Sequence, residues 1–290
     1  MAEEIKKLVQ EYCEGKISRR EFIQQAVVFT GSLAVATSLI DSLASTPAYA
    51  AQVDANDPAL ASSEVQFLGK AGTVFGYLTR PKVSGKYPAI VVIHQNRGLN
   101  EHIRDVARRF AKEGYVALAP DYLSRHGGTK KVSPEGKDVN VRELAPTQTV
   151  VEDTEASVTY LRTLSEIRGD RVGVVGFCWG GGMAFAVATQ SREPKAVVVY
   201  YGSTPTPSDL LKNIEAPVLA HYGELDKGIT GRVPQTEEAM KQYNKPFTYK
   251  IYPGAAHAFN DDDRPDRYNP EASKDAWNRT IEFFKKHLQS

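Results

Sequence analysis

The chain has 290 residues, of which 41% are hydrophobic, and a formal net charge of +1 at pH 7. This length and apolar content can bury the core of one α/β domain, and the near-zero charge argues against a nucleic-acid partner. The two cysteines, Cys13 and Cys178, exclude a disulfide scaffold, and the Cys and His spacings typical of metal sites are missing, so we expect no metal and no cofactor.

Residues 1–50 have the character of an export signal. Arg19-Arg20 resembles the twin-arginine motif, a weakly apolar stretch follows at Ala26–Ile40, and Ala48-Tyr49-Ala50 has the small-x-small pattern that a signal peptidase recognises. We predict transient binding to the twin-arginine translocase and signal peptidase, and a periplasmic protein. The alternative is an amphipathic N-terminal helix on a cytoplasmic protein. No apolar stretch is long enough to predict a stable membrane span.

After a polar linker or arm at residues 51–63, strand and helix patterns alternate along a domain that we place at residues 64–290. Two alternating runs around Lys70-Ala71-Gly72 predict an antiparallel hairpin. Continuous apolar runs predict buried parallel strands at 88–94, 115–120, 171–177, 196–201, 217–222 and 247–252. Helical spacings appear at 100–114, 150–165, 183–189, 233–243 and 269–288, while 121–149 is interpreted as a long loop.

This alternation predicts an α/β fold with a mostly parallel sheet of about eight strands. Helices are expected on both faces of the sheet, with no inserted cap domain. Asn100 and Asn269 are expected to cap the helices that follow them, because an asparagine side chain can accept a free backbone N–H at a helix start.

The most informative motif is Gly176-Phe177-Cys178-Trp179-Gly180, between a predicted strand and a predicted helix. Its spacing is that of the G-x-S-x-G nucleophile elbow, with cysteine in the place of serine. Glycine on both sides permits the sharp turn, and the helix N-terminus favours negative charge on the sulfur. The alternative is a chance match around a buried cysteine.

A nucleophilic cysteine needs a base, and the base needs a carboxylate that orients it. In this architecture, both follow the nucleophile, acid first and histidine second, at the ends of later strands. Asp226 follows the strand at 217–222 and His257 follows the strand at 247–252, so we assign them these roles, with Glu224 as the rival acid. The other histidines are expected in the oxyanion loop (His94), in the long loop (His126), inside a strand (His221) and on exposed helix faces (His102 and His287).

Together with His94–Asn100 and Gly254–Phe259, these motifs resemble the dienelactone hydrolase family of α/β-hydrolases over nearly all of residues 65–288. The leader is similar to that of an exported branch of the family. The resemblance implies a Cys178, His257 and Asp226 triad that hydrolyses an enol lactone or related ester through a thioester acyl-enzyme. It further implies an oxyanion hole formed by the backbone N–H groups of Asn96 and Trp179, and a substrate carboxylate bound by Arg125.

Two positions depart from the family pattern. Gln95 replaces a glutamate that contacts the resting thiol; it cannot take up a proton but can donate an N–H to a thiolate or an acyl oxygen. Asp261 replaces a second carboxylate-binding arginine, with Arg97 and Arg264 as cations that could offset it, and we interpret residues 261–263 as a solvated acidic loop. The sequence predicts hydrolysis of a small-molecule ester or lactone; the alternatives are a broad carboxylesterase and a non-catalytic binding protein on the same fold.

Overall fold

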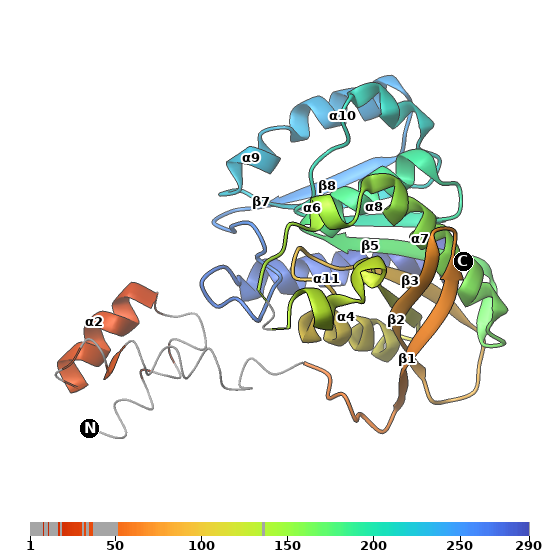
Figure 1. Ribbon diagram of the computed structural model, residues 1–290. Coiled ribbons are helices and arrows are strands. Elements are labelled where there is room, and N and C mark those ends of the chain that lie inside the picture. The colour runs from red at the N-terminus through yellow and green to blue at the C-terminus, as the bar shows by residue number, and fades with distance from the viewer. Residues whose placement is uncertain are drawn as a thin grey trace.

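The computed structural model describes residues 52–134 and 137–289, together with helix α2 (Arg19–Thr30) and a few single residues near it (Figure 1). The side chains of Arg19 and Arg20 and the predicted cleavage site at residues 48–50 lie outside the described residues. In the part of the chain that is described, no helix combines the length and the apolar character needed to cross a membrane.

An eight-stranded sheet forms the centre of the fold, in the order β1-β2-β4-β3-β5-β6-β7-β8. β1 pairs antiparallel with β2 through a hairpin that turns at Lys70-Ala71, β2 pairs antiparallel with β4, and every other neighbouring pair is parallel. The α/β-hydrolase prediction is thereby confirmed. The strands are β1 (Leu60–Gly69), β2 (Gly72–Pro81), β3 (Tyr87–Ile93), β4 (Val116–Asp121), β5 (Ile167–Phe177), β6 (Ala196–Tyr200), β7 (Val218–Gly223) and β8 (Phe247–Tyr252).

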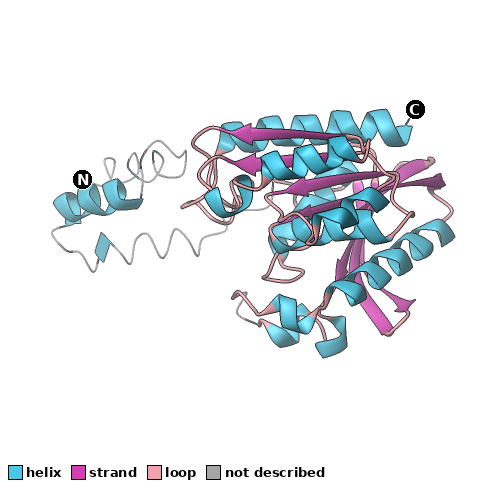
Figure 2. Cartoon of the chain, turned by 90° about the horizontal axis from the view of Figure 1, so that it is seen from above, coloured by secondary structure: helices cyan, strands magenta, loops and turns pink. Residues whose placement is uncertain are grey.

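Helices cover both faces of this sheet (Figures 1 and 2). The helices on one face are α7 (Thr147–Thr163), α8 (Trp179–Gln190) and α10 (Val233–Gln242), and those on the other are α4 (Glu101–Lys112) and α11 (Pro270–Phe284). Side chains of a strand alternate between the two cores, so that Ala89 and Val91 pack on one and Ile90 and Val92 on the other. Because both cores are apolar, the strands appear as continuous apolar runs in the sequence.

Both predicted helix caps are present in the structure. The side chain of Asn100 accepts the N–H of Ile103 at 3.1 Å, and that of Asn269 accepts the N–H of Ala272 at 3.0 Å.

Two segments that were predicted to be irregular contain regular structure, so those predictions are wrong in part. β1 begins at Leu60, inside the arm predicted at residues 51–63. The predicted loop at 121–149 holds the short helices η2 (Ser124–His126), α5 (Thr129–Val132) and α6 (Val141–Leu144) and the start of α7. The other short helices are η3 (Ser208–Asn213), α9 (Lys227–Thr230) and η4 (Lys285–Gln289).

Candidate active site

Cys178 lies at the turn between β5 and α8, at the carboxyl end of a central strand. Its backbone has φ 57° and ψ −118°, which L-residues rarely adopt. A Cβ on Gly176 would lie 2.0 Å from the carbonyl oxygen of Gly180, and a Cβ on Gly180 would lie 2.3 Å from that of His94. Both glycines of the motif are therefore required by close backbone contacts. The half-buried thiol sits at the N-terminus of α8, where the helix dipole favours negative charge.

An imidazole and a carboxylate complete a chain of contacts that begins at this thiol. His257 Nε2 lies 3.0 Å from Cys178 Sγ, and His257 Nδ1 lies 2.5 Å from Asp226 Oδ2. The adjacent parallel strands β7 and β8 bring both residues to the same edge of the sheet. A carboxylate only accepts, so Nδ1 donates to Asp226 and Nε2 faces the sulfur. The rival acid, Glu224, instead accepts the backbone N–H of Gly254 at 2.9 Å.

The contacts of His257 also set its charge. Burial opposes protonation of the imidazole, but the hydrogen bonds with Asp226 and Cys178 outweigh it and raise the pKa of His257 to about 9. At neutral pH the imidazole therefore carries a proton on both nitrogens, and the one on Nε2 points to the sulfur.

His94 supports the loop that follows β3. Its Nδ1 donates to the carbonyl oxygen of Gln95 at 2.7 Å, its Nε2 accepts the N–H of Tyr122 at 3.2 Å, and its ring stacks on that of Trp179 with 5.4 Å between centroids. Complete burial lowers the pKa of His94, so it stays neutral. Asn96 and Trp179 line the same pocket as Cys178, and no backbone acceptor among the described residues binds their backbone N–H groups.

The two departures from the family pattern, Gln95 and Asp261, contact each other. Gln95 Nε2 donates to Asp261 Oδ2 at 3.1 Å, and only 4% of Gln95 and 0% of Asp261 is exposed. Asp261 Oδ1 also accepts the backbone N–H of Asp263 at 3.2 Å. The interpretation of residues 261–263 as a solvated loop is therefore wrong for Asp261, and one of the two amide N–H groups of Gln95 is bonded to this buried carboxylate.

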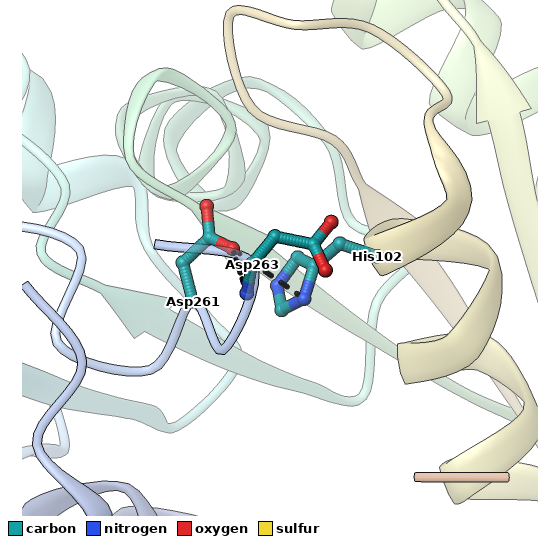
Figure 3. Close-up of side chains that lie close together, drawn as sticks. All are labelled: His102, Asp261 and Asp263. Carbon is teal, nitrogen blue, oxygen red and sulfur yellow. Dashed lines mark hydrogen bonds and ion pairs between the residues drawn. The ribbon is translucent and has the colours of Figure 1, made fainter. Parts of the chain in front are cut away.

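His102, expected on an exposed helix face, is buried in the same cluster (Figure 3). Its Nδ1 lies 2.8 Å from Asp262 Oδ1 and 3.6 Å from Asp261 Oδ1, and Arg109 also pairs with Asp262, at 2.5 Å. Burial opposes its charge, but the two aspartates outweigh burial and raise the pKa of His102. His102, Asp261 and Asp263 offer possible metal-ligand atoms within 4.8 Å of one another, but these ion pairs already explain the group and we assign no metal to it.

A pocket of about 240 Å³ opens over Cys178 and His257. The three residues predicted to bind substrate, Gln95, Arg97 and Arg125, are not among those that line it. The guanidinium of Arg125 pairs with the buried carboxylate of Asp153 and donates to the carbonyl oxygen of Thr73 at 3.3 Å. The lining residues are Asn96, Val139, Asn140, Val141, Arg142, Cys178, Trp179, Tyr201, Ser203, Ile229 and His257.

Sequence analysis missed one side of this pocket. Residues 139–142, at the start of α6, were assigned to a loop, and nothing in their sequence marks them as part of a site. They reach the pocket because the N–H of Val139 donates to the carbonyl oxygen of Asn96 at 3.2 Å, which holds this segment against the loop after β3. Tyr201 did carry a signal, since it ends a predicted strand that neighbours the elbow in a parallel sheet.

Comparison with known proteins agrees with the fold. The chain matches the model of the dienelactone hydrolase family over residues 74–288. A Methylorubrum extorquens protein named "Putative carboxymethylenebutenolidase" is 33% identical over 267 residues, 87% of this chain and 91% of that protein. A Bradyrhizobium protein named "Probable 2-oxo-3-(5-oxofuran-2-ylidene)propanoate lactonase" is 34% identical over 223 residues, 73% of this chain and 89% of that protein.

A solved structure extends the comparison to three dimensions. The crystal structure of a "Putative Dienelactone Hydrolase" from Klebsiella pneumoniae matches with a TM-score of 0.71 and 29% identity, over 79% of this chain and 99% of that one. The family model and the relatives each span most of the domain that carries the pocket. The chain therefore belongs to the dienelactone hydrolase family and is a hydrolase of the ester or lactone type.

Proposed function

We propose that this chain hydrolyses a carboxylic ester or an enol lactone by nucleophilic catalysis at Cys178. The observation that carries the proposal is the unbroken chain of contacts from sulfur to imidazole at 3.0 Å and from imidazole to carboxylate at 2.5 Å. Nucleophile, base and orienting acid need this arrangement. The names of the relatives, which specify a butenolidase and a lactonase, support the substrate class.

In the first half of the reaction, the sulfur of Cys178 attacks the carbonyl carbon of the substrate. A C–S bond forms, the carbonyl π electrons move to oxygen, and the backbone N–H groups of Asn96 and Trp179 bind the resulting oxyanion. When the C=O bond re-forms, the C–O bond to the leaving oxygen breaks, and this oxygen takes a proton from His257 Nε2. The product is a thioester on Cys178; with a lactone, the leaving oxygen stays attached to the acyl chain.

In the second half, His257 takes a proton from a water molecule, whose oxygen attacks the thioester carbonyl. Collapse of that intermediate breaks the C–S bond, releases the carboxylic acid and returns the thiolate beside the protonated imidazole. Asp226 keeps the Nδ1 proton in place throughout. The raised pKa of His257 supports this scheme, because a protonated imidazole 3.0 Å from the sulfur both stabilises a thiolate and can supply the proton that the leaving oxygen needs.

A specific observation favours a second candidate, a carboxylesterase with no need for an anionic substrate. Arg125 is engaged with Asp153, away from the pocket lining, and buried Asp261 adds negative charge beside Gln95. Arg142, on α6, is the one permanently charged residue among those that line the pocket, and it is the group there that could still bind a substrate carboxylate. A neutral ester and a carboxylate-bearing ester of equal acyl length separate the two candidates, since only a site specific for anions prefers the second.

The main test uses 4-nitrophenyl acetate and butyrate with the wild type and Cys178→Ala. Loss of hydrolysis in Cys178→Ala, with normal activity in the control Cys13→Ala, is the expected result. Mass spectrometry after a rapid acid quench should find the acyl group on Cys178. Hydrolysis that continues unchanged in Cys178→Ala would refute the proposed nucleophile.

We also propose that the chain is exported to the periplasm by the twin-arginine translocase and cleaved after Ala50 by signal peptidase. Its support is the sequence of residues 1–50, with Arg19-Arg20 followed by an apolar stretch and Ala48-Tyr49-Ala50. Cell fractionation should find the protein in the periplasm, and Arg19→Lys/Arg20→Lys should retain it in the cytoplasm. Continued export of the double variant would contradict this route.

A further inference from the structure

Tyr201 lines the pocket that holds the proposed nucleophile, and its buried hydroxyl has no hydrogen-bond partner among the described residues. Buried polar atoms nearly always have one, so each exception needs an explanation. The unpartnered buried side-chain atoms of the described residues belong to His102, Tyr115, Arg125, Asp153, Tyr201 and Tyr222. Of these residues, only Tyr201 lines the pocket over Cys178 and His257.

The backbone holds Tyr201 firmly in this place. Tyr201 directly follows β6 and has φ 40°, a conformation that is strained for an aromatic residue. Its N–H donates to the carbonyl oxygen of His221 at 2.7 Å, and the preceding carbonyl, of Tyr200, accepts the N–H of Cys178 at 3.0 Å. The end of β6 is thereby joined to the nucleophile on one side and to β7 on the other. Strained residues of this kind persist mostly at functional sites.

The surroundings of the ring leave the hydroxyl as a donor without a fixed acceptor. The ring is completely buried, with its centroid 5.2 Å from that of His257 and 5.3 Å from that of Phe259. Burial raises the pKa of Tyr201 well above its ordinary value, and the charges of Asp261 and Cys178 raise it further. The hydroxyl therefore keeps its proton at every pH at which His257 changes charge.

Two negative groups act on this hydroxyl, and one of them changes charge during the proposed reaction. Asp261 already accepts N–H groups from Gln95 and Asp263. The sulfur of Cys178 becomes negative before each attack and again when the thioester breaks. The neutral hydroxyl of a residue that lines the same pocket can turn its proton toward this charge, and a hydrogen bond to a charged acceptor is among the strong ones.

We propose that Tyr201 is a further catalytic residue, whose hydroxyl donates a hydrogen bond to the sulfur of Cys178 whenever that sulfur is a thiolate. This inference rests on the proposed function, in which the thiolate is both the attacking group and the group expelled from the thioester. The proton stays on the tyrosine oxygen at every stage, so His257 remains the group that transfers protons. In this proposal the hydroxyl lacks a fixed acceptor because its acceptor is the negative charge that develops on the sulfur of Cys178.

The test compares Tyr201→Phe with Tyr115→Phe in a full-length Cys13→Ala background, where Cys178 is the one remaining thiol. Tyr115 is the matched control, because its hydroxyl is also buried and unpartnered among the described residues, while the residue directly precedes β4 and is not part of the pocket lining. The rate of alkylation by iodoacetamide is measured against pH, with kcat and KM for 4-nitrophenyl acetate and thermal melting. Tyr201→Phe should move the alkylation midpoint up by about one pH unit and lower kcat about 10- to 100-fold, with KM within about twofold.

Substitution of Tyr201 by 3-fluorotyrosine keeps the hydroxyl and makes it a stronger donor. It should move the alkylation midpoint down, a direction that general damage to the fold would not produce. If Tyr201→Phe matches Tyr115→Phe in midpoint and kcat, or if both Tyr201 substitutions move the midpoint the same way, the proposal is overturned and the hydroxyl is only a packing group. Alkylation needs no substrate, so the alkylation midpoint tests the role of Tyr201 independently of hydrolysis. Hydrolysis that continues in Cys178→Ala would refute the proposed function but would not change the result of the alkylation experiment.

Discussion

The contact between Gln95 and Asp261 predicts that Gln95→Glu destabilises this chain, although glutamate is the residue that the family pattern favours there. The substitution keeps the shape of the side chain but replaces an N–H donor, 3.1 Å from Asp261 Oδ2, by a second carboxylate oxygen. Asp261 is fully buried, and its oxygens face the Gln95 amide, the N–H of Asp263 and the imidazole of His102. These groups are all donors facing the carboxylate of Asp261.

The cost can be worked from the geometry. Two carboxylate charges about 3 Å apart repel by about 5 kcal/mol at an effective dielectric constant near 20. Protonating the introduced carboxyl avoids this and costs about 1.4 kcal/mol per pH unit above its ordinary pKa of about 4.3, hence about 3.7 kcal/mol at pH 7. Protonation costs less than repulsion, so the new carboxyl becomes neutral. The pKa of this carboxyl is then higher in the folded chain than in the unfolded chain. The loss of unfolding free energy therefore grows as pH rises from about 4.3.

Urea unfolding at pH 5, 6 and 7 tests this reasoning for the wild type, Gln95→Glu and Gln95→Glu/Asp261→Asn. We expect the single variant to lose about 1 kcal/mol of unfolding free energy at pH 5 and 3 to 4 kcal/mol at pH 7. The double variant should recover most of the loss at pH 7, because it lacks the facing charge. A penalty below about 1 kcal/mol at pH 7, or one that does not change with pH, would refute the buried contact of the two side chains.

Three further predictions concern the site and its surroundings. Asp226→Asn removes the acceptor that orients His257, so kcat for 4-nitrophenyl acetate should fall about 10²- to 10⁴-fold with an unchanged circular dichroism spectrum; a fall below tenfold would contradict the assigned acid. Because the pKa of His257 is raised to about 9, the stabilisation from its ion pair is complete below pH 6.5 and is lost as pH rises through 9. The difference in unfolding free energy between the wild type and His257→Gln should therefore shrink over that range by at most about 3 kcal/mol. A difference that does not change with pH would contradict the raised pKa of His257. Arg125→Gln leaves the carboxylate of Asp153 buried without its cation, so the unfolding free energy should fall by about 3 kcal/mol while KM for a carboxylate ester stays unchanged. The double variant Arg125→Gln/Asp153→Asn should recover the lost stability. A raised KM in Arg125→Gln, with stability unchanged, would instead support a substrate-binding role for Arg125.

Much of the fold could be predicted because its signals occupy a few consecutive residues. A strand covered on both faces has to be apolar at every position, so the run at 88–94 predicted β3 almost to the residue. The caps Asn100 and Asn269 act on N–H groups three residues further on. The elbow glycines are equally local, since the turn itself brings Gly176 against Gly180. The order of the elements then placed Asp226 and His257 at the same edge of the sheet.

The features that could not be predicted depend on contacts between distant parts of the chain. The exposure of a helix face depends on what packs on it, and His102 is buried because the loop that contains Asp262 lies against α4. Gln95 and Asp261 were interpreted as two separate departures, each weighed against the thiol or the substrate, because no local pattern links positions 166 residues apart. The sequence around Arg125 resembles that of a substrate-binding arginine, but in the structure its guanidinium pairs with the carboxylate of Asp153, on α7.

Strained backbone conformations at and beside the pocket depend on the rest of the structure. Among the described residues, the non-glycine residues with positive φ are Cys178, Tyr201, Asn244 and Ala258. Asparagine tolerates this conformation, but the other three do not favour it. Cys178 and Tyr201 line the pocket just beyond strand ends, Ala258 directly follows His257, and each conformation costs about 1 to 3 kcal/mol. Such positions persist only when the rest of the structure determines them. The two apolar cores that make the strands predictable thus also hold the sulfur, the hydroxyl and the imidazole in a geometry that an isolated peptide would leave.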